Sequence, residues 1–92
     1  KYEKKMVNHN KYWLNKMYLE LLKLPIEPLN SRANFILIKV GKDVDRLVQF
    51  LMSKSIIVRK MSEYKLNDYI RVSVGKADEN KKFLRAISKF YS

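Results

Sequence analysis

Two arginines stand in strand-like segments, where their side chains could bind an anion. Arg59 ends the apolar run "SIIVR", and Arg71 lies within "YIRVSV". A guanidinium carries a planar fork of N–H donors that matches two oxygens of a carboxylate or phosphate. Alternatively, Arg71 is an ordinary strand arginine that pairs with Glu63, Asp68 or Glu79. Periodicity alone favours this second interpretation, so anion binding is at this point a hypothesis.

Other residue types that carry chemistry point to no catalytic centre. His9 is the only histidine, and it lies on a polar segment, which does not favour a metal or triad role. There is no cysteine, and therefore neither a disulfide nor a thiolate metal site. The acidic pairs Asp43/Asp45 and Asp78/Glu79 are typical of the first turn of a helix, where carboxylates complement the helix dipole.

Hydrophobic periodicity predicts the elements that position these residues. An apolar stripe at helical spacing predicts a helix over residues 3–24, which the prolines at 25 and 28 end in a short connector. Alternating or continuous apolar runs predict strands at 34–40, 55–59 and 69–74. Two further stripes predict a helix that starts at Asp43 and a last helix from about Asp78 to Tyr91. The inward-facing residues of the three helices are Leu14, Met17, Tyr18, Leu21 and Leu22; Val44, Leu47, Val48, Leu51 and Met52; and Phe83, Leu84, Ile87 and Phe90.

This order of elements predicts an α+β fold. We expect a small two-layer sandwich, in which a mainly antiparallel sheet of three to four strands carries the helices on one face. Successive strand residues point to opposite faces, so Ile70, Val72 and Val74 should face the helices while Arg71 faces away. In the preceding strand, Arg59 shares a side with Ile57. The second face of the sheet is therefore expected to combine guanidinium groups with apolar side chains, and we expect this face to cover a ligand.

Length and composition limit the possibilities further. Ninety-two residues make one small domain, residues 1–92, with 1–24 as a leading helix and 31–92 as the sheet-and-helix core. There is neither a long apolar run nor a signal peptide, and we expect a cytoplasmic protein. The net charge of +11 fits nucleic acid or an anionic surface. However, 15 of the 20 basic residues are Lys, and Asn and Ile are also frequent, as A/T-rich codon usage would produce.

Five segments, in order and with characteristic gaps, resemble a known family. "SRANFIL", "GKD", "SIIVR", "YKLNDYIRVSVG" and "DENKKFL" are similar to the C-terminal part of fold type I pyridoxal-phosphate-dependent aminotransferases. The closest subgroup is the histidinol-phosphate aminotransferase family. The resemblance runs from about Ser31 to the end of the chain, and more loosely through the first helix. It implies the small domain that closes over the active site of such an enzyme.

The resemblance also implies roles for particular residues. The arginine of the last strand, here Arg71, would bind the α-carboxylate of an amino-acid substrate, and Arg59 would lie near a distal phosphate. Asn34 and Ser31 match "S-x-A-N-F" and would be structural residues near the site. The chain departs from the family pattern at Ser55 and Lys65, where the family has glycine. A lysine at 65 suggests a different backbone path, because Lys tolerates positive φ poorly.

A third departure lies before the last helix, where Lys76 replaces a threonine. This change removes a hydroxyl N-cap and its capping box with Glu79, and Asp78 would then cap one turn later.

The chain shows no constellation that could hold pyridoxal phosphate. Lys54 and Lys60, beside the "SIIVR" segment, are more simply solvated strand edges than a Schiff-base lysine. We therefore expect a fragment of a longer enzyme, inactive alone, whose upstream large domain binds most of the cofactor. The expected substrate is an amino acid or a phosphorylated amino alcohol, and the parent enzyme is expected to be a homodimer. The alternatives are a small basic nucleic-acid-binding module, with Tyr69 and Arg71 stacking on bases, and a degenerate remnant.

Overall fold

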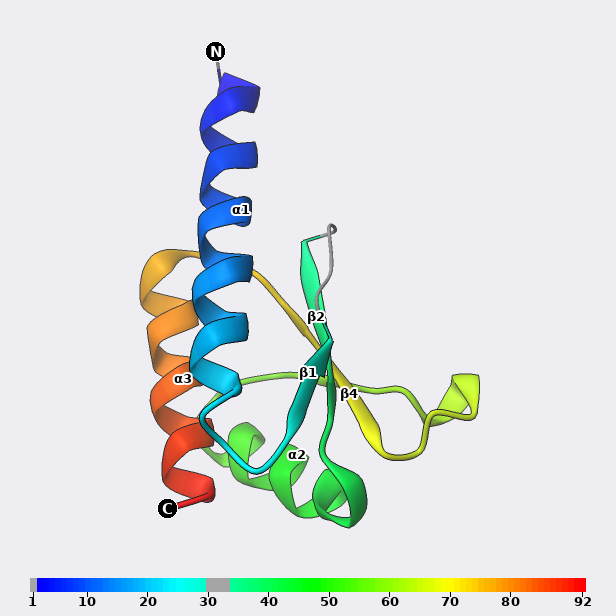
Figure 1. Cartoon of the computed structure of the whole chain (residues 1–92). Coiled ribbons are helices and arrows are strands. Elements are labelled where there is room, and N and C mark those ends of the chain that lie inside the picture. The colour runs from blue at the N-terminus through cyan, green and yellow to red at the C-terminus, as the bar shows by residue number, and fades with distance from the viewer. Residues whose placement is uncertain (1, 30–33) are drawn as a thin grey trace.

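The chain folds into three helices packed on one four-stranded sheet in the computed structural model, which describes residues 2–29 and 34–92, with side chains from residue 8 onward (Figure 1). All neighbouring strands are antiparallel, in the order β1-β2-β4-β3. The predicted α+β sandwich is confirmed. The elements are α1 (Tyr2–Leu21), β1 (Glu27–Leu29), β2 (Phe35–Lys39), α2 (Val44–Ser53), β3 (Arg59–Lys60), β4 (Tyr69–Ser73) and α3 (Ala77–Phe90), with short 3-10 turns at Gly41–Asp43 and Ser62–Tyr64.

One hydrophobic core lies between the sheet and the helices. Ile38 of β2 and Ile70 of β4 are fully buried, and so are residues on all three helices, including Met17, Leu47 and Ile87. Because alternate strand residues supply this core, the opposite face of the sheet carries the residues in between. The helices leave that face bare (Figure 1).

Some predicted boundaries and faces were wrong. The first helix ends at Leu21, and not at residue 24. Residues 27–29, which were expected to form part of a connector, instead form strand β1 and pair with β2. On α1 the buried stripe takes Trp13 in place of Leu22, and Met52 of α2 is also exposed. The segment 55–59 was predicted as a strand, but only Arg59–Lys60 pairs with β4. Exposed end residues explain these errors, because apolar residues at the end of an element satisfy the pattern without reaching the core.

The predicted change of backbone path at Lys65 was also wrong. Lys65 has φ 61° and Ser55 has φ 63°, so both stand in the left-handed conformation. That conformation favours glycine, because the Cβ of other residues crowds the following carbonyl oxygen. The chain therefore keeps a glycine-type backbone at both positions without the glycine.

The helix starts differ in detail from the prediction. Helix α3 begins at Ala77, so Asp78 lies in its first turn and does not cap a later one. Lys76 is the N-cap residue, and the Glu79 carboxylate accepts its backbone N–H at 2.9 Å, which preserves half of a capping box. Asp43 does occupy the N-cap position of α2, but its side chain makes no capping hydrogen bond and instead pairs with Arg46 at 3.5 Å.

Candidate anion-binding face

Strand β4 presents Arg71 on the side of the sheet that the helices leave bare. Its neighbours Ile70 and Val72 are buried in the core, whereas Arg71 is half-buried and Ser73 is exposed. This alternation is the one predicted from the sequence. The two buried neighbours anchor the strand and so fix the position from which the guanidinium projects.

The centre of this face is a row of residues in cross-strand register. Leu37 of β2, Arg71 of β4 and Arg59 of β3 stand directly opposite one another. The Arg71 guanidinium carbon also lies over the ring of Phe35, 4.6 Å from its centroid. A cation over an aromatic face is attracted by the ring quadrupole, and this contact restrains the long arginine side chain.

No acidic partner neutralises Arg71 within the described part of the chain. None of its carboxylates lies within ion-pairing distance of that guanidinium. The candidates from the sequence do other things: Glu63 pairs with Arg59, Glu79 caps α3, and the main-chain carbonyl of Asp68 accepts N–H groups of Val40 and Gly41. The alternative interpretation of Arg71 as an internally paired strand arginine is thus not supported by the described residues.

Arg59 is the more exposed of the two arginines. Its guanidinium lies 3.7 Å from the Glu63 carboxylate, and more than half of each side chain is exposed, at 56% and 74%. Ion pairs this open to water contribute little to stability. Arg59 therefore keeps most of its capacity to bind a second anion.

Two like charges in direct register across a strand pair destabilise a sheet. Arg59 and Arg71 form such a pair, and only Arg59 has a weak acidic neighbour among the described residues. An anion placed between the two guanidiniums would remove the repulsion and accept hydrogen bonds from both. The pair of arginines therefore makes this face a candidate anion-binding site.

The other two residues that were predicted near the site are Asn34 and Ser31. Asn34 is exposed immediately before β2, where its main-chain carbonyl accepts the Val74 N–H at 2.8 Å and extends the β2–β4 ladder. Ser31 lies outside the described residues.

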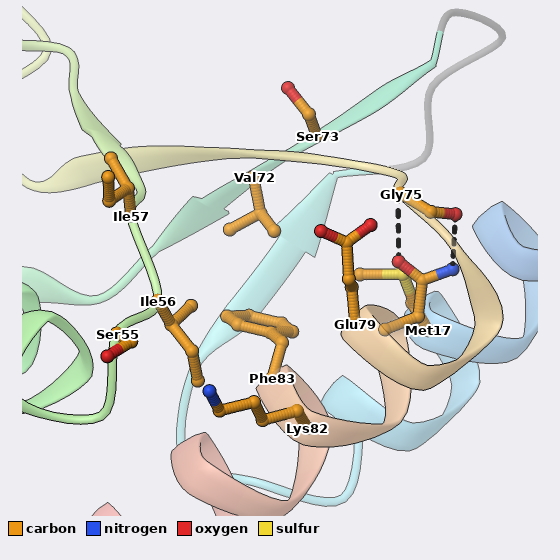
Figure 2. A pocket seen from close by; sticks show the side chains of 11 residues that line it. Met17, Ser55, Ile56, Ile57, Val72, Ser73, Gly75, Glu79, Lys82 and Phe83 are labelled. Atoms are coloured by element: carbon orange, nitrogen blue, oxygen red, sulfur yellow. Dashed lines mark hydrogen bonds between the residues drawn. The ribbon is translucent and has the colours of Figure 1, made fainter.

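A polar cluster at the start of α3 was not predicted from the sequence. The side chain of Asn80, only 2% exposed, accepts the Gly75 N–H at 2.8 Å and donates to the Gly75 carbonyl at 3.0 Å (dashed lines in Figure 2). The His9 ring nitrogen Nε2 lies 2.9 Å from the same carbonyl oxygen and donates to it, which ties α1 to the end of β4. The available signal was the position of Asn80, which continues the buried stripe of Phe83 and Ile87 one turn earlier.

The described lysines do not form a cofactor site. All of those whose side chains are described are exposed except Lys16, which is half-buried on α1. A Schiff-base lysine works in a desolvated setting that lowers its pKa. The lysines whose side chains are described therefore do not offer the buried position that a Schiff-base lysine needs.

The fold is similar to that of solved aminotransferase structures. A putative aminotransferase from Burkholderia pseudomallei superposes with a TM-score of 0.79 and 26% identity, over 85% of this chain and 24% of that one. No family model matches the chain.

No helix in the described residues is long and apolar enough to cross a membrane.

Curated relatives narrow the class. Histidinol-phosphate aminotransferase from Desulfotalea psychrophila is 45% identical over 76 residues, which is 83% of this chain and 19% of that protein. The enzyme of the same name from Paramagnetospirillum magneticum is 38% identical over 87 residues, 90% of this chain and 24% of that protein. The resemblance to the C-terminal small domain of fold type I aminotransferases, and within them to the histidinol-phosphate aminotransferase family, is confirmed. The chain spans about a fifth to a quarter of the length of these relatives.

Proposed function

We propose that this chain is the domain of a pyridoxal-phosphate-dependent aminotransferase that binds the anionic group of the substrate and closes the active site. Arg71 is the principal anion ligand, and Arg59 is the second. The observation that supports this most is their cross-strand register on the bare face of the sheet, with no described carboxylate beside Arg71. The relatives named above are aminotransferases, which is consistent with it.

The surroundings of Arg71 suit the orientation of a substrate. A strand anchored by Ile70 and Val72 holds its backbone, and its guanidinium carbon lies over the ring of Phe35, 4.6 Å from the ring centroid. The N–H groups on the rim of the guanidinium stay available for two oxygens of a carboxylate or phosphate. A substrate held at two points keeps its reacting amine in a constant position, which is how positioning lowers a reaction barrier.

The proposed substrate is an amino acid or a phosphorylated amino alcohol. Both carry an anionic group with two or more oxygens in the geometry that a guanidinium fork matches. The names of the relatives point to histidinol phosphate, whose phosphate would take the place between Arg71 and Arg59.

The rest of the chemistry belongs to other parts of the enzyme. Pyridoxal phosphate would supply the electron sink, and a large domain of the same chain would hold it, because the described lysines do not. In this proposal residues 1–92 form one domain, and the complete enzyme is a cytoplasmic homodimer. The sheet of that domain begins at Glu27, since β1 pairs with β2.

The proposal is tested by kinetics of an enzyme that joins this domain to the remainder present in its relatives. Arg71→Ala should raise KM for the substrate about 10- to 100-fold, the loss expected from one or two charge-assisted hydrogen bonds. Arg71→Lys should recover only part of that loss, because an ammonium lacks the fork. Arg85→Ala on the exposed side of α3 is the matched control. Unchanged KM in Arg71→Ala would contradict the proposal, and tight oligonucleotide binding that needs Arg71 would favour the nucleic-acid alternative.

A further inference from the structure

The outer edge of β4 is only partly covered by β3. The Met61 N–H donates to the Tyr69 carbonyl, and the Val74 N–H donates to the carbonyl of Asn34 beside β2. Main-chain groups of an antiparallel strand point alternately to its two sides. The odd-numbered residues of β4 therefore direct their N–H and C=O groups toward β3, and the even-numbered residues direct theirs toward β2.

Pairing with β3 stops before the end of β4. Arg59 pairs with Arg71, so a continued ladder would place Ile57 opposite Ser73. Residues 55–58 are not strand, however, and Ile57 is 87% exposed. Beyond Ser73, Asn80 takes both main-chain groups of Gly75. Among the described residues, Ser73 is thus left with an unpaired N–H and C=O at an open edge.

A cavity lies in the gap that β3 leaves. It has a volume of about 320 Å³, and its wall includes Ile56 and Ile57 on one side, Val72 and Ser73 on the other, and Phe83 from α3 (Figure 2). Lys82 also lines it and pairs with no carboxylate in the described part of the chain. The Glu79 carboxylate beside it is already bonded to the Lys76 N–H.

We propose that this edge binds an extended peptide segment as an added strand. Its central residue would exchange main-chain hydrogen bonds with Ser73, which is the recognition mode in which a free sheet edge supplies affinity and side pockets supply specificity. The residues on either side of it would face the cavity, because strand side chains alternate. The apolar wall formed by Val72 and Phe83 selects a branched aliphatic residue. Lys82 and the net charge of +11 select an acidic one.

The experiment uses the 92-residue chain and the peptide acetyl-Thr-Val-Thr-Glu-Thr-amide, followed by amide NMR. Saturable shifts are expected at Ser73 and Ile57, and hydrogen exchange of the Ser73 amide should slow several-fold. N-methylation of the central threonine should weaken binding by about ten-fold, because it removes one main-chain hydrogen bond. Replacing the glutamate by lysine should weaken it as well. A peptide that binds equally well when N-methylated would overturn the proposal, as would the absence of a saturable shift at Ser73.

Two variants at one position separate main-chain from side-chain effects. Ser73→Pro removes the N–H that faces the open edge and should abolish binding. Ser73→Ala keeps that N–H and should bind as the parent chain does. Protection of the Ser73 amide in the free chain, together with concentration-dependent self-association, would show that a second copy occupies the edge and would overturn the peptide assignment.

Discussion

The guanidinium of Arg71 lies over the ring of Phe35, 4.6 Å from its centroid, and the two side chains come from neighbouring strands. This contact holds a flexible cation in one orientation on the bare face of the sheet. No carboxylate among the described residues pairs with that guanidinium, so its N–H donors remain available to an anion.

Phe35→Leu should therefore weaken anion binding while leaving the fold intact. Leucine preserves an apolar side chain on the half-buried side of β2 but provides no quadrupole to orient Arg71. We expect a loss of about 0.5–1 kcal/mol, or two- to five-fold in affinity for phosphate or a phosphomonoester. Titration by NMR measures it, and circular dichroism checks the fold. Leu29→Ala on the edge strand β1, which is separated from Arg71 by strand β2, is the control that should leave the affinity unchanged.

Asn80 should be the most important polar residue for stability. Asn80→Ala leaves the N–H of Gly75 without its partner and takes one of two donors from the Gly75 carbonyl. An unsatisfied group costs about 1–3 kcal/mol when it is fully buried, and because Gly75 is half-buried we expect a loss of about 1 kcal/mol. Urea unfolding measures the loss, and Asn67→Ala at an exposed turn is the matched control. Equal stability of the two variants would contradict the role assigned to Asn80.

Glycine at Ser55 or Lys65 should stabilise the protein. Both residues have positive φ, where an L-residue with a Cβ pays a steric cost that glycine avoids. After the entropy that glycine loses on folding, we expect a gain of about 0.5–1 kcal/mol for each substitution. Ser53→Gly, in the last turn of α2, provides the contrast and should destabilise. Thermal unfolding distinguishes the signs, and a loss of stability in Ser55→Gly and Lys65→Gly would show that the left-handed backbone is not populated in solution.

Tyr91 should make stability depend on alkaline pH. Burial, together with the nearby Asp43 carboxylate, raises the pKa of Tyr91 from 10.0 to about 12. Between these two values the unfolded chain has released the phenolic proton and the folded chain still holds it. The Tyr91 contribution is therefore complete below pH 10 and is lost as the pH rises toward 12.

Tyr91→Phe isolates this effect. The phenylalanine variant should lose less stability than the parent chain between pH 10 and 12, measured as the difference between their urea midpoints. At neutral pH the variant should be at least as stable, because the buried Tyr91 hydroxyl has no hydrogen-bond partner among the described residues. Parallel pH profiles for the two proteins would show that the phenol is solvated.

The sequence was sufficient for the fold class and for the face that carries Arg71. Strand alternation is a strong constraint when one face is a core, and Ile70 and Val72 fixed the orientation of their neighbours. The contact between Arg71 and Phe35 could not be predicted from the sequence, because strand order and register depend on contacts between distant segments. The β1 strand was missed since Pro28 argues against a strand, although an edge position tolerates proline.

Local conformation was the least predictable feature. Lysine at position 65 was expected to divert the backbone, but the 3-10 turn at Ser62–Tyr64 and the bond from the Leu66 N–H to the Met61 carbonyl impose the left-handed residue. Tertiary and turn contacts outweigh a preference of about 1–2 kcal/mol of this kind. Strand β3 is short for a related reason: the apolar residues 56–58 before it fit a strand pattern, but only Arg59 and Lys60 pair with β4.

The most direct test of the central claim is a titration of the 92-residue chain with O-phosphoethanolamine, followed through the arginine Nε–Hε signals. We expect saturable shifts for Arg71 and Arg59, with none for Arg85, and loss of the Arg59 shift in Arg71→Ala. Equal, non-saturating shifts of all the arginines would contradict the claim, because they would mean that the ligand only screens surface charge.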